Sequence, residues 1–147
     1  MKGPSKITVR RISKGELYLV RGLDHTIFGV DGCEAEEEEY SESKWWLAYD
    51  GDTAIGFSGA LVYAGKWAIQ LQRTGILRPY RGKGLQKRFI RTRLAYAKRL
   101  SVGHAHTYCA DWNLASANSL ISCGFKLYVP EWAYAGNDVF YFIKAIK

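Results

Sequence analysis

Two glycines lie among cations in the segment Ile76–Leu100, ILRPYRGKGLQKRFIRTRLAYAKRL. Gly82 and Gly84 lack the Cβ atoms that would keep a ligand away from the main chain, so the amides beside them can converge on an anion. Arg81 and Lys83 add positive charge, and the helical pattern that follows brings the positive end of a helix dipole to the same place. These residue types at this spacing predict a phosphate-binding site, with a tight strand-to-helix connection as the alternative.

Two other phosphate-binding motifs do not fit this segment. A Walker A loop needs Ser or Thr after its Gly-Lys pair, but Gly84 follows Lys83, and Leu77 stands at the first glycine position. A dinucleotide fingerprint, GxGxxG, would need glycine where Lys87 stands. Both motifs are therefore excluded on particular residues.

The segment resembles the phosphate-binding motif of the GCN5-related N-acetyltransferases, or GNAT family. That motif has Arg or Gln, two residues, Gly, one residue, then Gly or Ala. Arg81 and Gly84 match it, whereas Gln86 departs from it. A second segment, NLASANSLISCGF, is similar to another motif of the family through Asn113, Ser116 and the closing Gly124-Phe125. The resemblance covers nearly the full chain and is weakest over 29–43.

The resemblance implies acetyl-CoA as cosubstrate. Its pyrophosphate would bind the backbone amides of Arg81–Gln86, and its pantetheine arm would run beside Ile76 and Leu77. Asn113 and Ser116 would contact the arm from the next strand–helix junction. The residues implied for cofactor binding are Ile76, Leu77, Arg81, Gly82, Lys83, Gly84, Leu85, Gln86, Asn113 and Ser116.

The implied reaction is acyl transfer from a thioester to an amine. The resemblance implies that a backbone N–H near the end of the long strand stabilises the oxyanion, and Leu77 is our candidate. The family's usual proton donor to the departing thiolate is a Tyr, but that position is Leu120 here. Tyr108, Tyr80 and Ser119 are the alternatives, and Tyr108 lies on the strand that leads into the second motif.

A protonated amine must lose its proton before it can attack, so the reaction also needs a base. The long strand offers Gln70, Gln72 and Thr74 but no carboxylate, so a base there would act through ordered water. Asp111 is the nearest acidic alternative. It could equally cap the following helix or pair with a cation.

Composition bounds the class of protein. The chain has 147 residues, 48% of them hydrophobic, which predicts one globular domain over residues 1–147. The net charge of +7 suggests an anionic partner without choosing among nucleic acid, a phosphorylated cofactor and an acidic surface.

The amino-terminal segment lacks the apolar middle of a signal peptide and no apolar run could cross a bilayer, so we expect a cytoplasmic protein without a membrane partner. The three cysteines show no metal-ligand spacing, and no metal site is predicted; they are Cys33, Cys109 and Cys123.

Hydrophobic periodicity predicts the elements that would position these residues. Strands are expected at 6–12, 45–63 (a hairpin with a type-I′ turn at Asp50-Gly51), 67–77, 104–111, 125–129 and 138–146, and helices at 13–23, 85–100 and 113–123. Residues 29–43 are expected to form a loop or a short, weakly held helix. The order predicts an α/β fold of the GNAT type, with a mixed, mostly antiparallel sheet flanked by helices.

Several features have competing interpretations. The acidic run Glu34–Glu39 could attract a cationic substrate or be a solvated loop, and the basic face of the long helix could be a solvated surface or a binding patch. Arg93 lies on that helix's apolar side and is expected to snorkel or to pair with a carboxylate. Trp132 and Tyr134 could floor an acceptor pocket.

The sequence thus predicts an N-acetyltransferase acting on an unidentified primary amine, either a small molecule or a protein. The alternative is a non-catalytic module on the same fold that binds CoA, nucleic acid or protein. We do not expect nucleic acid as the main partner. A homodimer is compatible with the chain's size, although no sequence feature shows an interface.

Overall fold

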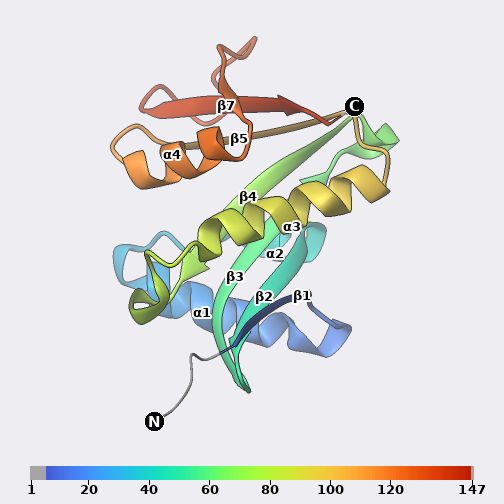
Figure 1. Cartoon of the computed structure of the whole chain (residues 1–147). Coiled ribbons are helices and arrows are strands. Elements are labelled where there is room, and N and C mark those ends of the chain that lie inside the picture. Colours follow the sequence, from blue (N-terminus) through green and yellow to red (C-terminus); the bar gives the residue numbers. More distant parts are fainter. Residues whose placement is uncertain (1–5, 147) are drawn as a thin grey trace. The chain divides into compact units, whose positions relative to one another are not determined.

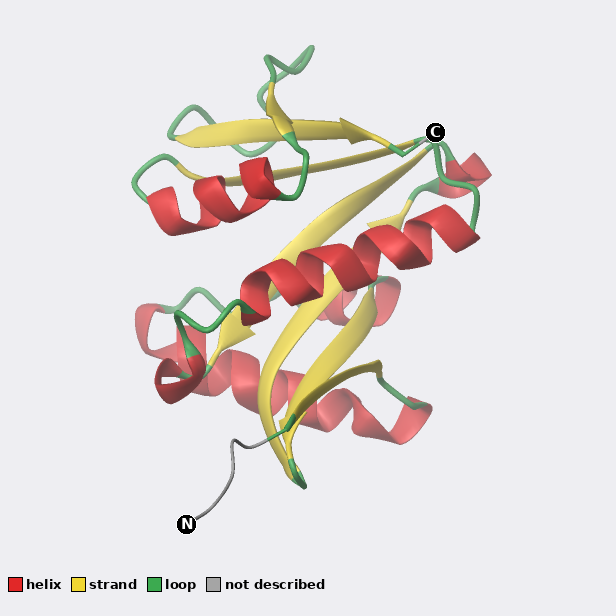
Figure 2. Cartoon of the chain, viewed as in Figure 1, coloured by secondary structure: helices red, strands yellow, loops and turns green. Residues whose placement is uncertain are grey.

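The computed structural model describes residues 6–146 (Figure 1). Their strands form a sheet in the order β1-β2-β3-β4-β5-β7-β6. The pairs β1–β2, β2–β3, β5–β7 and β6–β7 are antiparallel, whereas β4 and β5 run parallel over Ala68–Gln70 and His104–His106. The predicted mixed sheet flanked by helices is confirmed (Figure 2). Within the described residues, no helix is both long enough and apolar enough to span a membrane.

Contacts divide the chain into two compact units. The first unit runs to Ala60 and also includes 72–85; the second comprises 61–71 and 86–147. The first contains β1 (Ile7–Arg11), α1 (Leu17–Phe28), α2 (Glu37–Glu42), β2 (Lys44–Asp50), most of β3 (Thr53–Val62) and the second half of β4 (Ala68–Ile76). The second contains α3 (Leu85–Arg99) from Gln86, β5 (His104–Ala110), α4 (Leu114–Ser122), β6 (Lys126–Leu127) and β7 (Val139–Ala145).

The first unit begins with the predicted Ser cap. Ser13 and Glu16 form a capping box around the 3₁₀ turn Lys14–Glu16, which leads directly into α1. Glu16 also accepts hydrogen bonds from Arg10 on β1, at 2.7 and 2.6 Å, and from Tyr49 on β2, at 2.7 Å. One carboxylate thus ties the start of α1 to two strands.

The core of the first unit is aromatic and aliphatic. The buried side chains of Val20, Leu47 and Phe57 pack with Trp45, whose indole N–H donates to the carbonyl of Tyr40 at 3.0 Å. Because this donor is satisfied, the large ring can be buried without an orphaned polar group. The core fixes α1 and α2 against β2 and β3.

The predicted type-I′ turn is wrong. The turn between β2 and β3 has Gly51 and Asp52 at its centre, since Asp50 pairs with Thr53. Gly51 has φ +58°, but Asp52 is not among the positive-φ residues, whereas type I′ requires positive φ at both. A bulge between Ala48 and Tyr49 shifts the register just before the turn. The Asp-Gly pair located the hairpin but not the turn type.

The acidic run is not simply a solvated loop. Residues Glu37–Glu42 form α2, and Arg21 on α1 binds both carboxylate oxygens of Glu37, one of them at 2.8 Å. His25 lies 3.1 Å from the Glu34 carboxylate. The first turn of α2 carries three of the Glu residues, which favours helix formation there through the helix dipole.

Arg93 does not snorkel, so that alternative is wrong, whereas its pairing with a carboxylate stays a prediction. Its side chain is only 2% exposed, and its Nε donates to the Phe89 carbonyl at 3.1 Å. Burial lowers the pKa of the guanidinium to about 9, so it still carries its charge at neutral pH. The exposed side of α3 carries the predicted basic face.

Candidate functional site

The approach to α3 is a tight turn rather than a free loop. Pro79 is the second residue of a 3₁₀ turn, Arg78–Tyr80, and the Arg81 amide donates to the Arg78 carbonyl at 3.1 Å. Gly82 and Gly84 then adopt left-handed φ angles of +76° and +82°. Only glycine takes such angles without strain, so the turn explains both glycines.

The amides after this turn are available to an anion. Within the described residues, the N–H groups of Gly82, Lys83 and Gly84 have no backbone acceptor, and the first-turn amides of α3 have none by helix geometry. Among the described residues, a Cβ added at either glycine would meet no atom within 4 Å beyond its chain neighbours, so the space above the backbone is open. These donors at the N-terminus of a 15-residue helix fit a phosphate group.

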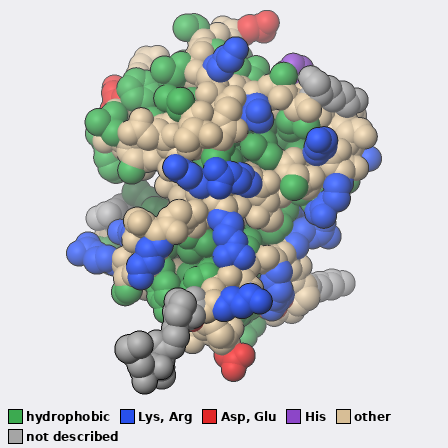
Figure 3. All heavy atoms as spheres, viewed as in Figure 1, with side chains coloured by type: hydrophobic (Ala, Val, Ile, Leu, Met, Phe, Trp, Pro, Cys, Tyr) green, Lys and Arg blue, Asp and Glu red, His purple; other side chains and the backbone are tan. Residues whose placement is uncertain are grey.

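Arg81 contributes differently from the prediction. Its amide is already used in the 3₁₀ turn, and its Nε donates to the Ile76 carbonyl at 2.8 Å. The Arg81 amide therefore does not belong with the free donors, and only the rest of the guanidinium can face a ligand. Figure 3 shows that Lys and Arg side chains greatly outnumber acidic ones on the face in view.

The departure at Gln86 has a structural reason. The Gln86 amide donates to the Ser116 hydroxyl at 3.0 Å, and the Ser116 backbone N–H donates to the Asn113 side-chain oxygen at 3.2 Å. Asn113 is the N-cap of α4. Three residues predicted to bind the cofactor thus lie together in the second unit, where they connect the starts of α3 and α4.

Leu77 is not a free oxyanion donor. Its N–H donates to the Ile55 carbonyl at 3.0 Å, so the predicted role is corrected. Adjacent amides of an extended chain point to opposite edges, which makes the Ile76 N–H the nearest alternative. The predicted contact of Ile76 and Leu77 with the cofactor arm stays a prediction.

The three Tyr and Asp candidates have distinct surroundings. Tyr80 donates to Asp50 at 2.6 Å, and this hydrogen bond raises its pKa, which makes it a poor proton donor. Tyr108 is 44% exposed on β5, with its ring centroid 6.1 Å from that of Tyr134. Asp111 is exposed, and because Asn113 caps α4, the capping role considered for Asp111 is wrong.

The family model for acetyltransferases (GNAT) matches residues 16–125. The chain belongs to the GNAT family. The predicted family, fold and enzyme class are therefore confirmed. A search of curated protein sequences found no match.

Solved GNAT structures share the fold at low sequence identity. Spermidine N-acetyltransferase from Vibrio cholerae, solved with CoA and spermine, is 20% identical over 95% of each chain, with a TM-score of 0.71. Ribosomal-protein-S18-alanine N-acetyltransferase from Escherichia coli is 12% identical over 96% of this chain and 94% of that chain, with a TM-score of 0.78. A putative acetyltransferase from Salmonella typhimurium, solved with acetyl-CoA, has the same identity and coverage and a TM-score of 0.74. These identities support a shared fold only.

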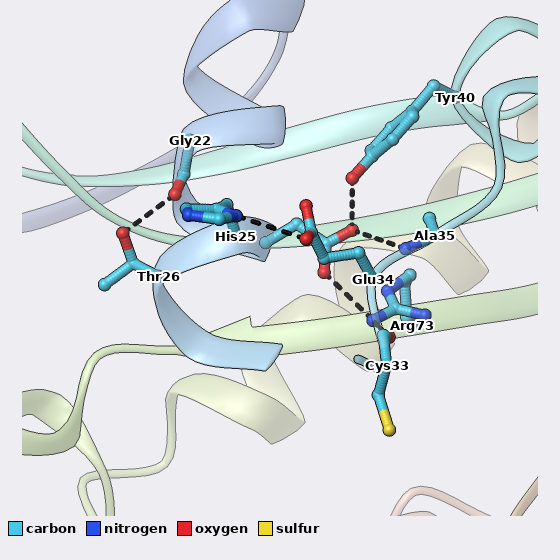
Figure 4. A network of polar contacts seen from close by, with 9 residues as sticks. Gly22, His25, Thr26, Cys33, Glu34, Ala35, Tyr40 and Arg73 are labelled. Atoms are coloured by element: carbon cyan, nitrogen blue, oxygen red, sulfur yellow. Dashed lines mark hydrogen bonds and ion pairs between the residues drawn. The ribbon is translucent and has the colours of Figure 1, made fainter. Parts of the chain in front are cut away.

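A buried polar network in this GNAT chain was not predicted (Figure 4). Asp24 on α1 is fully buried and accepts hydrogen bonds from Tyr40 at 2.6 Å, from the Ala35 amide at 3.1 Å and from Arg73 on β4 at 2.9 Å. Arg73 also donates to the Cys33 carbonyl, and its guanidinium lies 4.7 Å from the centre of the Phe28 ring. The network fixes residues 33–40 against β4. The sequence signal for this network was Asp24, an acidic residue among the apolar positions of the helical pattern that forms α1.

Glu39 on α2 has a raised pKa, in contrast to Glu37 on the same helix, whose pKa the hydrogen bonds from Arg21 lower. Burial raises the pKa of Glu39, an effect opposed by the nearby positive charge of Arg73. Gln72 lies in hydrogen-bond contact with Ser43, one turn after Glu39, which places this end of α2 beside β4. Sequence reasoning searched the strand itself for a carboxylate and missed one carried on α2.

Proposed function

We propose that the chain transfers the acetyl group of acetyl-CoA to a primary amine. The supporting observation is the set of open amides from Gly82 to the first turn of α3, which fits the pyrophosphate of the cosubstrate. Gly82, Lys83, Gly84, Leu85 and Gln86 would hold that group. Acetyl-CoA supplies an activated acyl thioester.

The chain's own task is to handle protons and developing charge. The amine nitrogen forms the new C–N bond after losing a proton, the C–S bond breaks, and the sulfur receives a proton. We propose the Ile76 N–H as the donor to the oxyanion and Tyr108 as the proton donor to sulfur. Asp111 and Glu39 are the carboxylates proposed for the base, the second because burial favours its uncharged form and so raises its basicity.

Calorimetric titration with acetyl-CoA and with CoA tests cosubstrate binding. We expect micromolar binding of both, followed by release of a free thiol when pooled primary amines are added. Binding without thiol release from any pool would contradict the transferase and leave a CoA-binding module. If neither acetyl-CoA nor CoA binds, the proposed phosphate-binding site itself is contradicted.

The single domain over residues 1–147, the cytoplasmic location and the homodimer remain proposals. Each has its own test: unfolding experiments, cell fractionation and light scattering, respectively. None of them is needed for the proposed reaction.

A further inference from the structure

The second unit carries exposed aromatic rings that its core does not use. Trp132 is 72% exposed, Trp67 is 60% exposed and Tyr108 is 44% exposed. Exposed rings in contact with one another differ from scattered surface hydrophobic residues and mark a binding site. We call this surface the aromatic face; its residues are Tyr63, Trp67, His106, Tyr108, Trp132 and Tyr134.

Three rings form the floor of the aromatic face. The ring centroids of Tyr63 and Trp67 are 5.2 Å apart with an interplanar angle of 14°, and those of Tyr63 and His106 are 5.5 Å apart at 11°. Trp67 and His106 are themselves only 6.2 Å apart at 25°. These distances and near-parallel planes describe an offset stack of the three rings, and Trp67, the most exposed of them, is where a further ring can be added to the stack.

Tyr134 forms a wall beside this floor. Its ring is steeply inclined to His106, at 73° and 6.0 Å, and to Tyr108, at 77° and 6.1 Å. Trp132 extends the wall, with its ring 5.9 Å from that of Tyr134. Parallel and perpendicular rings side by side match the two geometries that aromatic pairs prefer.

Hydrogen bonds hold the floor and the wall in place. Tyr63 donates to Gln70 on β4, and the Tyr134 hydroxyl lies 3.4 Å from His106 Nδ1. The segment that carries Tyr134 is held by Tyr141, which accepts from the Ala135 amide at 2.9 Å and donates to the Gly136 carbonyl at 2.7 Å. Rings fixed in this way lose little conformational entropy when a ligand binds.

The chemistry of the aromatic face favours a planar ring over a bare cation. None of the six residues of the aromatic face is acidic, so the face offers no carboxylate to an ammonium group. Burial lowers the pKa of His106, which leaves the floor uncharged at neutral pH. A flat ring can stack on Trp67 and meet Tyr134 edge to face.

The face also leads toward the proposed cofactor arm. Tyr108 lies on β5, which runs into Asn113 at the start of α4. We propose that the aromatic face binds the ring of the acceptor, so that the acceptor is a primary amine carrying a planar aromatic group. This inference rests on the proposed acetyl transfer and adds the class of its substrate.

Two matched probes test the role of the ring. 2-Phenylethylamine and 2-cyclohexylethylamine carry the same aminoethyl group, but only the first has a planar π system. Binding is followed by calorimetry and by tryptophan fluorescence without acetyl-CoA, and acetylation by thiol release with it. We expect the aromatic amine to bind and to react about fivefold better, as measured by Kd and kcat/KM.

Substitutions at Trp67 separate the ring from its bulk. Trp67→Leu keeps an apolar side chain and should remove the preference for 2-phenylethylamine over 2-cyclohexylethylamine. Trp67→Phe should retain most of this preference. Tyr18→Ala removes an exposed aromatic side chain of α1, outside the aromatic face. This variant should bind and acetylate both amines as the wild type does. Calorimetric binding of acetyl-CoA should be the same in all three variants.

The outcomes distinguish the two proposals. Equal binding of both amines, or an undiminished preference in Trp67→Leu, would overturn the aromatic acceptor even if acetyl transfer occurs. Ring binding without acetyl-CoA binding would support the face and contradict the transferase. Loss of a dimer in Trp67→Leu, without amine binding in the wild type, would show that a second copy covers the face and would overturn the proposal.

Discussion

At the scale of single residues, Gly84 is the sharpest test of the phosphate site. Its φ of +82° and its open surroundings mean that a glutamate there would point into the proposed pyrophosphate position. We expect Gly84→Glu to weaken acetyl-CoA binding at least about 100-fold, because negative charge and bulk oppose the pyrophosphate. Calorimetry measures this change directly.

Gly51→Glu is the matched control for Gly84→Glu. Gly51 also has positive φ, +58°, and an added Cβ there would also meet no atom of the described part of the chain within 4 Å, its neighbours aside, but it lies in the β2–β3 turn. Both substitutions carry similar backbone strain, so a similar loss of stability is expected in both. Equal acetyl-CoA affinity in the two variants would contradict the proposal that the turn at Gly84 binds the pyrophosphate.

Tyr108 tests the proposed proton donor. Tyr108→Phe keeps the ring and its contact with Tyr134 but removes the hydroxyl, so acceptor binding should be retained. If the hydroxyl protonates the departing sulfur, kcat should fall about 100-fold while KM changes little. A kcat unchanged at saturating substrates would exclude the role. Tyr18→Phe, on the exposed side of α1, controls for the chemical change alone.

At the scale of elements, Asp24 determines how the α1–α2 connection is held to β4. Asp24→Asn keeps the shape but removes the charge that faces Arg73, whose buried Nε already has no hydrogen-bond partner among residues 6–146. We expect the free energy of unfolding to fall by about 3 kcal/mol, since the Arg73 guanidinium, whose side chain is only 21% exposed, then loses its hydrogen-bonded counter-ion. Urea unfolding measures this loss.

Tyr40→Phe controls the Asp24 experiment. It removes one neutral donor to the same carboxylate while leaving the ion pair intact, so the expected loss is about 1 kcal/mol. Equal losses in the two variants would show that the charge of Asp24 contributes nothing beyond a hydrogen bond.

Glu16 makes the start of α1 sensitive to acid. The hydrogen bonds from Arg10, followed by those from Ser13 and Tyr49, hold its pKa far below the ordinary value of 4.5. A lowered pKa stabilises the fold above the unfolded-state value, and this contribution is lost as the pH falls from there toward the folded-state pKa. Glu16→Gln should therefore flatten the fall in thermal stability between about pH 5 and about pH 3. A variant with the wild-type slope would contradict this.

Sequence patterns were sufficient to predict some of the helix ends and turns. Local signals predicted the Ser13 cap, the helix closed at Gly124 and the glycine turn before α3, because each depends on residues close in sequence. Arg93 and the Asp24–Arg73 pair could not be predicted in this way. Their burial depends on which neighbours the tertiary fold supplies, and a polar residue in an apolar pattern shows only that some partner is required.

In the candidate site, too, features set by neighbouring residues were predicted, and features set by residues distant in sequence were not. The glycines and Asn113 follow from motif spacing, whereas the engagement of the Leu77 amide by Ile55 depends on strand pairing. Gln86 departs from the motif for a reason that only α4 reveals, since its partner Ser116 lies 30 residues away. Hydrogen-bond partners distant in sequence are therefore the part that motif reading misses.

At the scale of the whole molecule, β4 decides whether the two units unfold together. The chain passes from one unit to the other after Ala60 in β3, after Leu71 in the interior of β4 and after Leu85 at the start of α3. Breaking a strand in its interior would expose ladder groups at the break, so separate unfolding should be unfavourable. We therefore expect one cooperative transition for the predicted single domain.

Hydrogen exchange in increasing urea tests this cooperativity. The amides of Val20 and Leu47 report on the first unit, and those of Ala105 and Phe142 report on the second; all four residues are fully buried. If the chain is one domain, both pairs should lose protection at the same urea concentration and with the same free energy, because they open only by global unfolding. Two distinct midpoints would show that each unit is a separate folding unit.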